Sequence, residues 1–328
     1  MNLTQLQTTQ AMQTVLDTYG KFNALPFETL SPEHARQLPS LTEAVRGVIG
    51  SQIAKRTMTP LPEPVAKVEH RLIPGQKSDI LVRIYTPEGQ GPFPLLLYFH
   101  GGGWVIANLD TYDSSCRSLA NLAECIVVSV AYRQAPEHKF PTAIEEGFSA
   151  YTWLLDHAAE LNGDPARIAV GGESAGGNIA AVVSLLCRDR NVRSPLHQLL
   201  VYPITDFSFD TASYDENADA KPLSRDMMKW FCRHYLNSPS EAAHPYASPL
   251  RSTDFSALPP ATVITAEIDP LRSEGEAYAK KLEEAGIAVQ FRNFEGVTHE
   301  FFGMKAVLPE AKDANEFAAE GLKAAFGE

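Results

Sequence analysis

A serine held between glycines is the first residue of this chain that could do chemistry. Residues 172–176 read GESAG and fit G-x-S-x-G, the pattern of a nucleophilic serine on a sharp turn between a strand and a helix. The apolar run 167–170 precedes the turn, and the Ala-rich apolar run 179–187 follows it. This context predicts that Ser174 is a nucleophile. The alternative is a glycine-rich turn that binds phosphate or only packs.

A serine hydroxyl is a weak nucleophile, so the chain must also supply a base that takes its proton. In sheets of this type the chain order is serine, then acid, then histidine. Four histidines follow Ser174: His197 precedes a strand, and His234 and His244 lie in or just after the long segment that starts at residue 206, for which we expect a lid. His299 alone follows the last expected strand, and we predict that it is the base.

The acid that orients the base should lie at the end of the preceding expected strand. That strand, 261–266, is followed by two acidic residues, Glu267 and Asp269. A proline after Asp269 disfavours helix at the aspartate and stiffens the loop. We therefore predict that Asp269 is the acid, with Glu267 as a neighbour that could tune the site.

Acyl transfer also needs hydrogen-bond donors for the negative charge that develops on the carbonyl oxygen, each worth roughly 3 kcal/mol. A triglycine loop, 101–103, follows the buried apolar run 94–99. It lacks G-x-G-x-x-G and the lysine of a phosphate-binding loop. We expect the backbone amides of Gly102, Gly103 and Ala175 to form this oxyanion hole, and His100 to brace the loop.

The rest of the sequence alternates strands with helices, which predicts an α/β fold with an eight-stranded, mostly parallel sheet covered by helices on both faces. The expected strands are 65–72, 80–85, 94–99, 125–132, 167–170, 198–202, 261–266 and 289–294. The expected helices between them are 114–122, 142–157, 177–187 and 273–285. Residues 1 to about 50 also look helical, with a start signal at Ser31.

The segment from residue 206 to about 246 is too long for a simple connection and is rich in aromatic residues and methionines. Ser224 can cap a helix within it. Its place after a strand end favours a lid over an apolar pocket, and the alternative is an extra packing helix. We expect the pocket to be lined by Trp104, Phe207, Met227 and Phe231.

Composition limits the classes of partner and location. The chain has 328 residues, 44% of them hydrophobic, and a net charge of −12, which disfavours nucleic acid and anionic membranes as partners. No apolar run reaches the length of a membrane helix, and the polar start has no signal-peptide pattern. We expect a single cytoplasmic domain, reduced cysteines and no metal site, since the sequence has neither C-x-x-C nor H-E-x-x-H.

Five stretches together resemble the bacterial hormone-sensitive-lipase family of carboxylesterases (family IV) within the α/β-hydrolases. They are 100–104, 132–141, 172–177, 269–271 and 299–301, in the family's order. The resemblance implies a triad of Ser174, Asp269 and His299 and an oxyanion hole of Gly102, Gly103 and Ala175. It also implies a helical cap formed by about 1–50 and about 206–246, and a catalytic core of about 51–205 and 247–328.

Family members usually hydrolyse short- to medium-chain acyl esters without a cofactor, and many are homodimers, so we expect an ester substrate and allow for a homodimer. One position departs from the family: the residue before the serine is usually Asp or Thr, and here it is Glu173. Two other classes of function remain open. One is a ligand-binding receptor on the same scaffold, and the other is an amidase, lactonase or acyltransferase.

Overall fold

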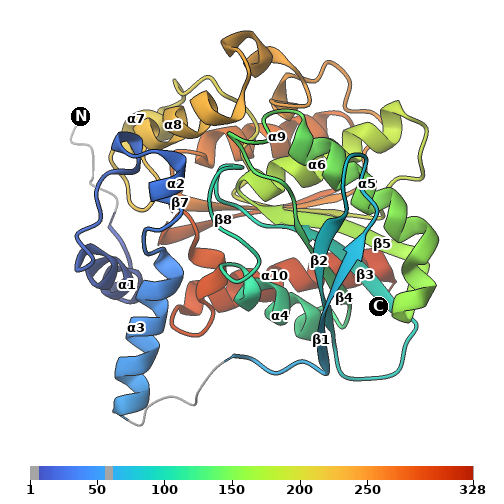
Figure 1. Cartoon of the computed structure of the whole chain (residues 1–328), viewed down its shortest axis with the longest axis horizontal. Helices are drawn as coiled ribbons and strands as arrows, with labels where there is room; N and C mark the ends of the chain where they lie inside the picture. Colours follow the sequence, from blue (N-terminus) through green and yellow to red (C-terminus); the bar gives the residue numbers. More distant parts are fainter. Residues whose placement is uncertain (1–6, 56–61, 328) are drawn as a thin grey trace.

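A single eight-stranded sheet forms the centre of the computed structural model, which describes residues 7–55 and 62–327 (Figure 1). The strands stand in the order β1-β2-β4-β3-β5-β6-β7-β8. Their bounds are β1 Lys67–Ile73, β2 Ile80–Thr86, β3 Phe93–Phe99, β4 Ile126–Ala131, β5 Gly163–Glu173, β6 Gln198–Val201, β7 Ala261–Ile268 and β8 Val289–Thr298. β2 runs antiparallel to β1 and β4, and the remaining pairs are parallel. The predicted α/β-hydrolase sheet is confirmed.

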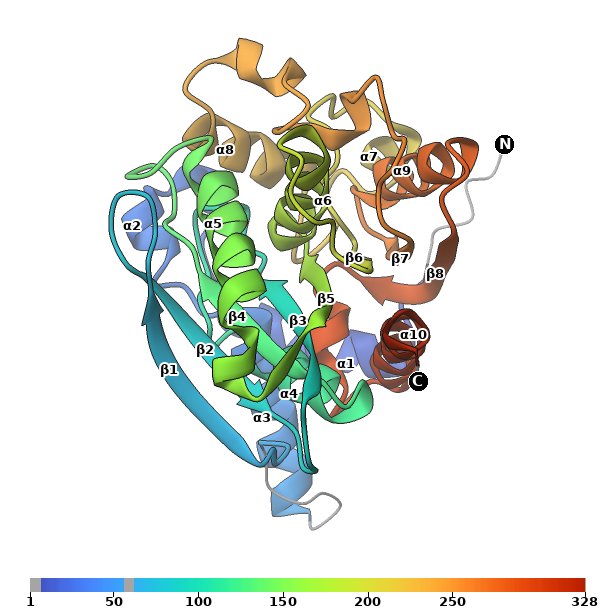
Figure 2. The same ribbon diagram turned by 90° about the vertical axis from the view of Figure 1, so that its right-hand side faces the viewer.

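Helices cover both faces of this sheet (Figures 1 and 2). α5 (Thr142–His157), α6 (Ala175–Asp189) and α9 (Arg272–Glu284) pack on one face. α4 (Asp113–Leu122) and α10 (Pro309–Phe326) pack on the other, beside α1 (Gln10–Gly20) and α3 (Leu41–Ala54). We did not predict α10; four of its eight buried residues are alanines, and charged residues lie between the buried ones.

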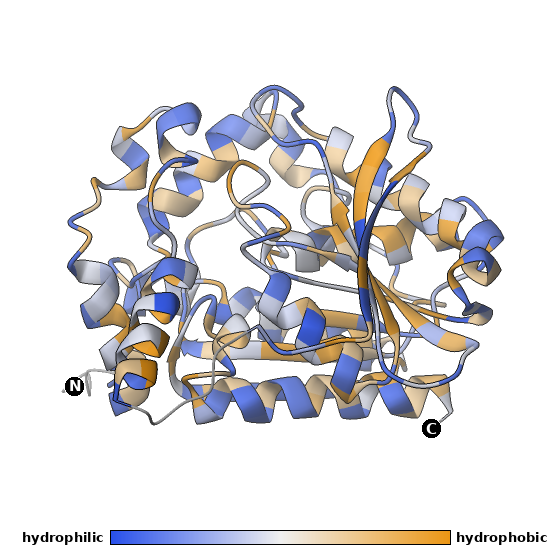
Figure 3. Cartoon of the chain, turned by 60° about the horizontal axis from the view of Figure 1, so that its bottom comes forward, coloured by the Kyte–Doolittle hydropathy of each residue, from blue (hydrophilic) through white to orange (hydrophobic). Residues whose placement is uncertain are grey.

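The central strand β3 shows why two cores form. All seven of its residues are buried, and successive side chains point to opposite faces. Leu95, Leu97 and Phe99 join the core under α5 and α6, whereas Leu96 and Tyr98 join the core under α4 and α10. A strand buried on both faces must therefore be apolar throughout, and Figure 3 shows the hydrophobic colour concentrated along the sheet.

The segment between β6 and β7 lies over the sheet edge together with the N-terminal residues. It contains α7 (Ala212–Glu216) and α8 (Arg225–Tyr235), and α8 begins after Ser224, whose hydroxyl accepts a hydrogen bond from the amide of Met227. The indole of Trp230 donates to the carbonyl of Leu30 at 3.0 Å, which joins the two segments. The N-terminal segment also holds α2 (Pro32–Ala35), capped as predicted by Ser31.

Both ends of the insertion are anchored on one side chain of α6. The amide of Asn178 donates to the carbonyl oxygens of Ile204 and Ala247, each at 2.9 Å. Asn178 is fully buried, so these hydrogen bonds form where water cannot replace them. The insertion is therefore held at its base by the same helix that follows Ser174.

The double-sided burial of β3 predicts the result of shortening one of its side chains. Leu97→Ala should lower the free energy of unfolding by about 2–5 kcal/mol, because it removes buried methyl groups and leaves a cavity. Leu72→Ala in β1, where the leucine is 63% exposed, should change it by less than about 0.5 kcal/mol. Urea unfolding followed by circular dichroism measures both, and equal effects would contradict the assignment of β3 to the core.

Candidate active site

Ser174 lies on a sharp turn between the end of β5 and the start of α6. Its backbone has φ 57° and ψ −117°, a region that costs energy for a residue with a side chain. Three backbone hydrogen bonds hold it there: its own amide donates to the carbonyl of Val201, and its carbonyl accepts from the amides of Ile204 and Asn178. The turn is so tight that a Cβ on Gly176 would lie 1.9 Å from the carbonyl oxygen of Phe99. The pattern's last glycine is thus required by backbone approach.

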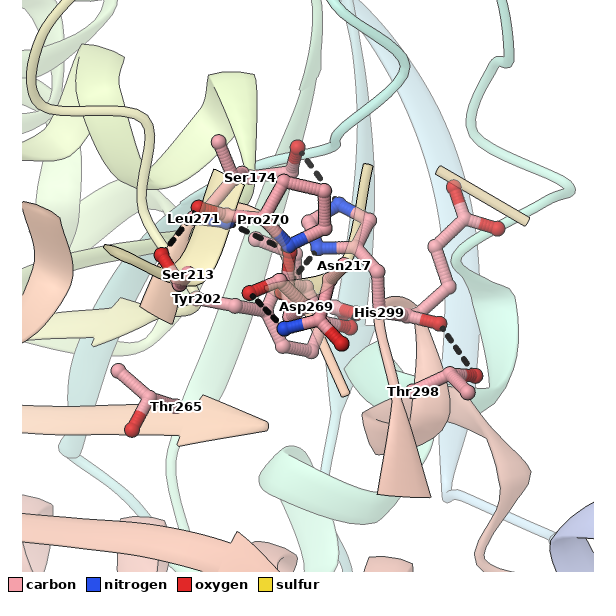
Figure 4. A network of polar contacts seen from close by, with 12 residues as sticks. Ser174, Tyr202, Ser213, Asn217, Thr265, Asp269, Pro270, Leu271, Thr298 and His299 are labelled. Carbon is pink, nitrogen blue, oxygen red and sulfur yellow. Dashed lines mark hydrogen bonds and ion pairs between the residues drawn. The ribbon is translucent and has the colours of Figure 1, made fainter. Parts of the chain in front are cut away.

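The structure brings Ser174, His299 and Asp269 together in one chain of hydrogen bonds (Figure 4). Nε2 of His299 lies 3.0 Å from Oγ of Ser174, and Nδ1 lies 2.6 Å from Oδ2 of Asp269. The other carboxylate oxygen of Asp269 accepts from the amide of Leu271 at 2.9 Å. Each of the three residues directly follows a strand, β5, β7 or β8, at the carboxyl edge of the sheet. All three are buried.

Opposing effects set the basicity of His299. Burial disfavours the imidazolium and lowers its pKa, whereas the Asp269 carboxylate, through its charge and its hydrogen bond, raises it. The nearby carboxylates Glu300 and Glu173 add smaller raising effects, and the net pKa of His299 lies above its ordinary value. The imidazole is therefore a stronger base than a free histidine, and it can accept a proton from Ser174 once the pH exceeds that pKa.

Backbone amides of two elements are candidate donors to an oxyanion at the serine. The loop after β3 places Gly102 at φ 98° and Gly103 at φ 57° in the cavity that also contains Ser174. Ala175 is the first residue of α6, where helix amides have no helical partner and the dipole favours negative charge. Within the described residues, the hydrogen bonds of the loop use the carbonyl of Gly102, not the two glycine amides. The prediction that these three amides bind an anion beside Ser174 therefore remains open to test.

The loop's histidine has the bracing position expected for it. His100 is buried, its Nδ1 lies 2.8 Å from the carbonyl of Gly101, and its ring stacks on Tyr132 at 4.3 Å. The hydroxyl of Tyr132 donates to the His100 carbonyl at 2.8 Å. Burial lowers the pKa of His100 to about 4, so this ring stays neutral and adds no charge to the site.

A carboxylate and two tyrosines lie directly behind the triad, and of these three residues only the carboxylate belongs to the serine motif of the sequence. Glu173 is buried and accepts hydrogen bonds from the hydroxyls of Tyr98 and Tyr202. The ring of Tyr202 lies 4.5 Å from the imidazole of His299, centroid to centroid. Burial raises the pKa of Glu173, while the two tyrosine hydrogen bonds oppose that rise. Glu173 thus orients the ring against which His299 packs.

Glu267, the alternative acid, does not contact His299. Its Oε2 accepts a hydrogen bond of 2.7 Å from the amide of Gly296, in β8 three residues before the histidine. Glu267 therefore supports the end of the strand that carries His299. The choice between the two carboxylates could not be made from charge or spacing alone, because both lie at the end of β7.

A cavity of about 370 Å³ opens in front of Ser174 and His299. Both the N-terminal segment and the β6–β7 insertion line it, through Tyr19, Phe27, Leu38, Pro222, Leu223, Met227 and Phe231. Two of the four expected pocket residues, Met227 and Phe231, are therefore in the lining.

Trp104 and Phe207 differ from the expectation, because the structure places them outside this lining. Trp104 is fully buried and stacks on the ring of Tyr235 at 4.0 Å, with Phe207 at 5.7 Å on another side. Large apolar rings gain most when they are removed entirely from water, and here they pack beneath α8. They support the insertion and do not face Ser174.

Metal-binding clusters and membrane-spanning helices are both absent from residues 7–55 and 62–327. No group of three or more His, Cys, Asp or Glu side chains is arranged to hold a metal ion in this part of the chain. No helix within the same ranges is long and apolar enough to cross a membrane.

Comparison with known proteins gives one family and several relatives. Residues 96–303 match the family described as alpha/beta hydrolase fold. The carboxylesterase NlhH of Mycobacterium tuberculosis is 40% identical over 295 residues, 88% of this chain and 92% of that protein. An ethyl acetate hydrolase of Pseudomonas putida is 37% identical, over 74% of this chain and 77% of its own. The crystal structure of an α/β-hydrolase enzyme from the metagenome of Lake Arreo has a TM-score of 0.87 and 38% identity, covering 98% and 99% of the two chains.

The raised pKa of His299 predicts the acid side of the pH profile. For hydrolysis of a short p-nitrophenyl ester, kcat/KM should fall as the pH drops through a pKa above about 6.5, because protonated His299 cannot act as a base.

Asp269→Asn should lower kcat by about 10⁴-fold, because the neutral amide no longer holds the required tautomer of His299. Asp313→Asn, at an exposed position of α10, is the control and should match wild type. A profile flat from pH 5 to 9 would exclude a histidine base.

The Glu173 network gives a second, separate prediction. Glu173→Gln removes a negative charge near His299 and leaves one tyrosine hydroxyl without its acceptor. The acid limb should move to lower pH, and unfolding should become easier by about 1–3 kcal/mol. Glu173→Asp keeps the charge and should retain the wild-type limb. An unmoved limb in Glu173→Gln, measured beside the thermal unfolding midpoint, would show that Glu173 does not act on His299.

Proposed function

The chain belongs to the α/β-hydrolase family, among the hormone-sensitive-lipase-like carboxylesterases, and is a carboxylic ester hydrolase; we propose that it cleaves short- to medium-chain acyl esters through Ser174, His299 and Asp269. The observation that carries the proposal is the pair of distances at His299, 3.0 Å to the serine oxygen and 2.6 Å to the carboxylate. A nucleophile, its base and the orienting acid then stand within hydrogen-bond reach of one another.

The proposed reaction has two stages that share one base. Ser174 attacks the ester carbonyl while His299 takes its proton, and the amides of Gly102, Gly103 and Ala175 bind the oxyanion. His299 gives this proton to the ester's alcohol oxygen as its bond to the carbonyl carbon breaks. The alcohol departs, and the acyl group stays on Ser174 as an acyl-enzyme. Water activated by the same imidazole then releases the acid. Asp269 stays ionised throughout and stabilises the imidazolium.

The size and walls of the cavity support the proposed range of acyl chains. A space of about 370 Å³ lies at the lower end of the range of small-molecule sites, and Met227 and Phe231 line it on the insertion side. The relative named as an ethyl acetate hydrolase is consistent with a short acyl group. The proposed cap, about 1–50 with about 206–246, is supported by the residues that both segments contribute to this cavity.

Two further expectations stay predictions. A cytoplasmic location rests on the sequence pattern, and a homodimer rests on the resemblance to the family. The acidic balance, 40 acidic against 28 basic residues, favours a small neutral ester over an anionic macromolecule as the partner.

Removal of the nucleophile tests the proposed function. Ser174→Ala should reduce kcat on p-nitrophenyl butyrate by about 10⁶-fold while the thermal unfolding midpoint stays near or above wild type, because the strained turn remains. Wild type, in contrast, should release a burst of one nitrophenol per chain wherever deacylation is the slower stage. Turnover by Ser174→Ala close to that of wild type would refute the proposal.

A further inference from the structure

A second and larger cavity, of about 540 Å³, lies beside the one that contains Ser174. It runs between α3, the start of α4 and the turn Phe301–Met304 that follows His299. One wall is a row of apolar side chains on α3, formed by Leu41, Val45, Ile49 and Ile53. Residues four apart lie on one helix face, so this row extends about 18 Å at 1.5 Å per residue. The wall is long, straight and apolar.

The two cavities share lining residues next to the catalytic histidine, which itself lines only the first cavity. Leu41, Thr111 and Glu300 line both of them, and Glu300 is the residue directly after His299. Glu300 has φ 68°, and its carboxylate accepts a hydrogen bond of 3.3 Å from the hydroxyl of Tyr112. The side chain of Glu300 thus stands between the two cavities, and this long hydrogen bond from Tyr112 is the one that holds it within the described residues. A substrate group that passes Glu300 would therefore enter the second cavity from the active site.

The position of the partition relative to His299 indicates which half of an ester would reach it. His299 must protonate the alcohol oxygen as that group leaves, so the alcohol half lies against the imidazole. Met227 and Phe231, across the first cavity, are on the insertion and not on the His299 loop. We therefore place the acyl half of the ester on the insertion side of the first cavity, near Met227 and Phe231. The alcohol half then lies next to Glu300.

The charges at the junction favour the same half. Glu300 and Glu173 both line the second cavity where it approaches His299. Carboxylates repel the anionic acid that hydrolysis produces, but they do not repel a neutral alcohol. The charged groups farther along are mostly paired, as Lys305 is with Glu63 at 3.1 Å and Arg117 is with Asp113 at 2.7 Å. No excess of positive charge recruits an acid.

We propose that the second cavity is the binding site for the alcohol half of the substrate, and that it selects esters of long, neutral aliphatic alcohols joined to short acyl groups. This inference rests on the proposed esterase function and adds to it the class of alcohol. Burial of an extended alkyl chain along Leu41, Val45 and Ile49 supplies the binding free energy. Glu300 stands at the entrance, where its side chain must turn aside.

Two isomeric esters separate the alcohol side from the acyl side. Octyl acetate and ethyl octanoate have the same formula and nearly the same hydrophobicity, but they carry the long chain on opposite halves. Wild type should show a kcat/KM at least about tenfold higher for octyl acetate, because two buried methylene groups already give a factor of that size. Proton release followed by a pH-stat measures both reactions, below the solubility limit of each ester.

A cavity-filling variant then locates the long chain. Ile49→Trp fills the middle of the second cavity and should lower kcat/KM for octyl acetate by about tenfold or more, with less than about a twofold change for ethyl octanoate. Leu196→Trp is the matched control, since Leu196 is 38% exposed and lines neither cavity. If Ile49→Trp does not fold, as judged by its unfolding midpoint, Val45→Phe fills the same wall with a smaller ring.

The outcomes distinguish this inference from the function on which it rests. Loss of octyl acetate hydrolysis alone supports it. A preference for ethyl octanoate, or an equal effect of the filling variant on both esters, would overturn it and leave the esterase function intact. If neither ester is hydrolysed in a Ser174-dependent way by wild type, the proposed function and this inference both fall.

Discussion

The close backbone packing at the end of β5 is the constraint on which the rest of the site depends. Gly176, at the start of α6, lies against the carbonyl of Phe99, so helix and sheet meet with no side chain between them. Only that approach lets Ser174 stand at an unfavourable backbone conformation with its oxygen outside the sheet. The apolar strands on either side are buried on both faces and supply the stability that offsets this local cost.

A second theme is the concentration of negative charge around one imidazole. Asp269 contacts His299 directly, while Glu173 and Glu300 act from the residues next to Ser174 and His299 in the chain. Burial alone would leave the imidazole a poor base, and the carboxylates reverse that effect. Glu173 also connects the charge to geometry, since the tyrosine that donates to it packs on the imidazole ring.

The parts of the fold that follow a simple period were readable from the sequence. Continuous apolar runs such as 94–99 and 125–132 are typical of strands buried on both faces. Chain order then points to His299 and to the two carboxylates Glu267 and Asp269, and the proline after Asp269 favours the aspartate. The helix α10 is harder to predict, because half of its buried residues are alanines and another is a glycine, whose small side chains mark a buried face only weakly.

Contacts between residues far apart in the sequence could not be predicted either. Trp104 is apolar and adjacent to the triglycine loop, and nothing in the sequence says that Tyr235 will cover it. Tyr202 is a single aromatic residue at a strand end, with no pattern around it that marks a role. Leu41 and Glu300 are separated by most of the sequence, yet both line the two neighbouring cavities. Such pairings depend on tertiary packing, which local periodicity does not encode.

The anchoring of the β6–β7 insertion on Asn178 has a consequence for how such a scaffold can change. The two ends of this segment of about forty residues are both hydrogen-bonded to the Asn178 amide. The segment is therefore attached to the sheet at the same two points, whatever residues lie between them. The entropy of closing a loop rises by only about 0.6 kcal/mol for each doubling of its length. The part of the insertion that lines the pocket can therefore be exchanged, lengthened or shortened while Ser174 keeps its position. Substrate range and the stability of the scaffold can then change independently during evolution.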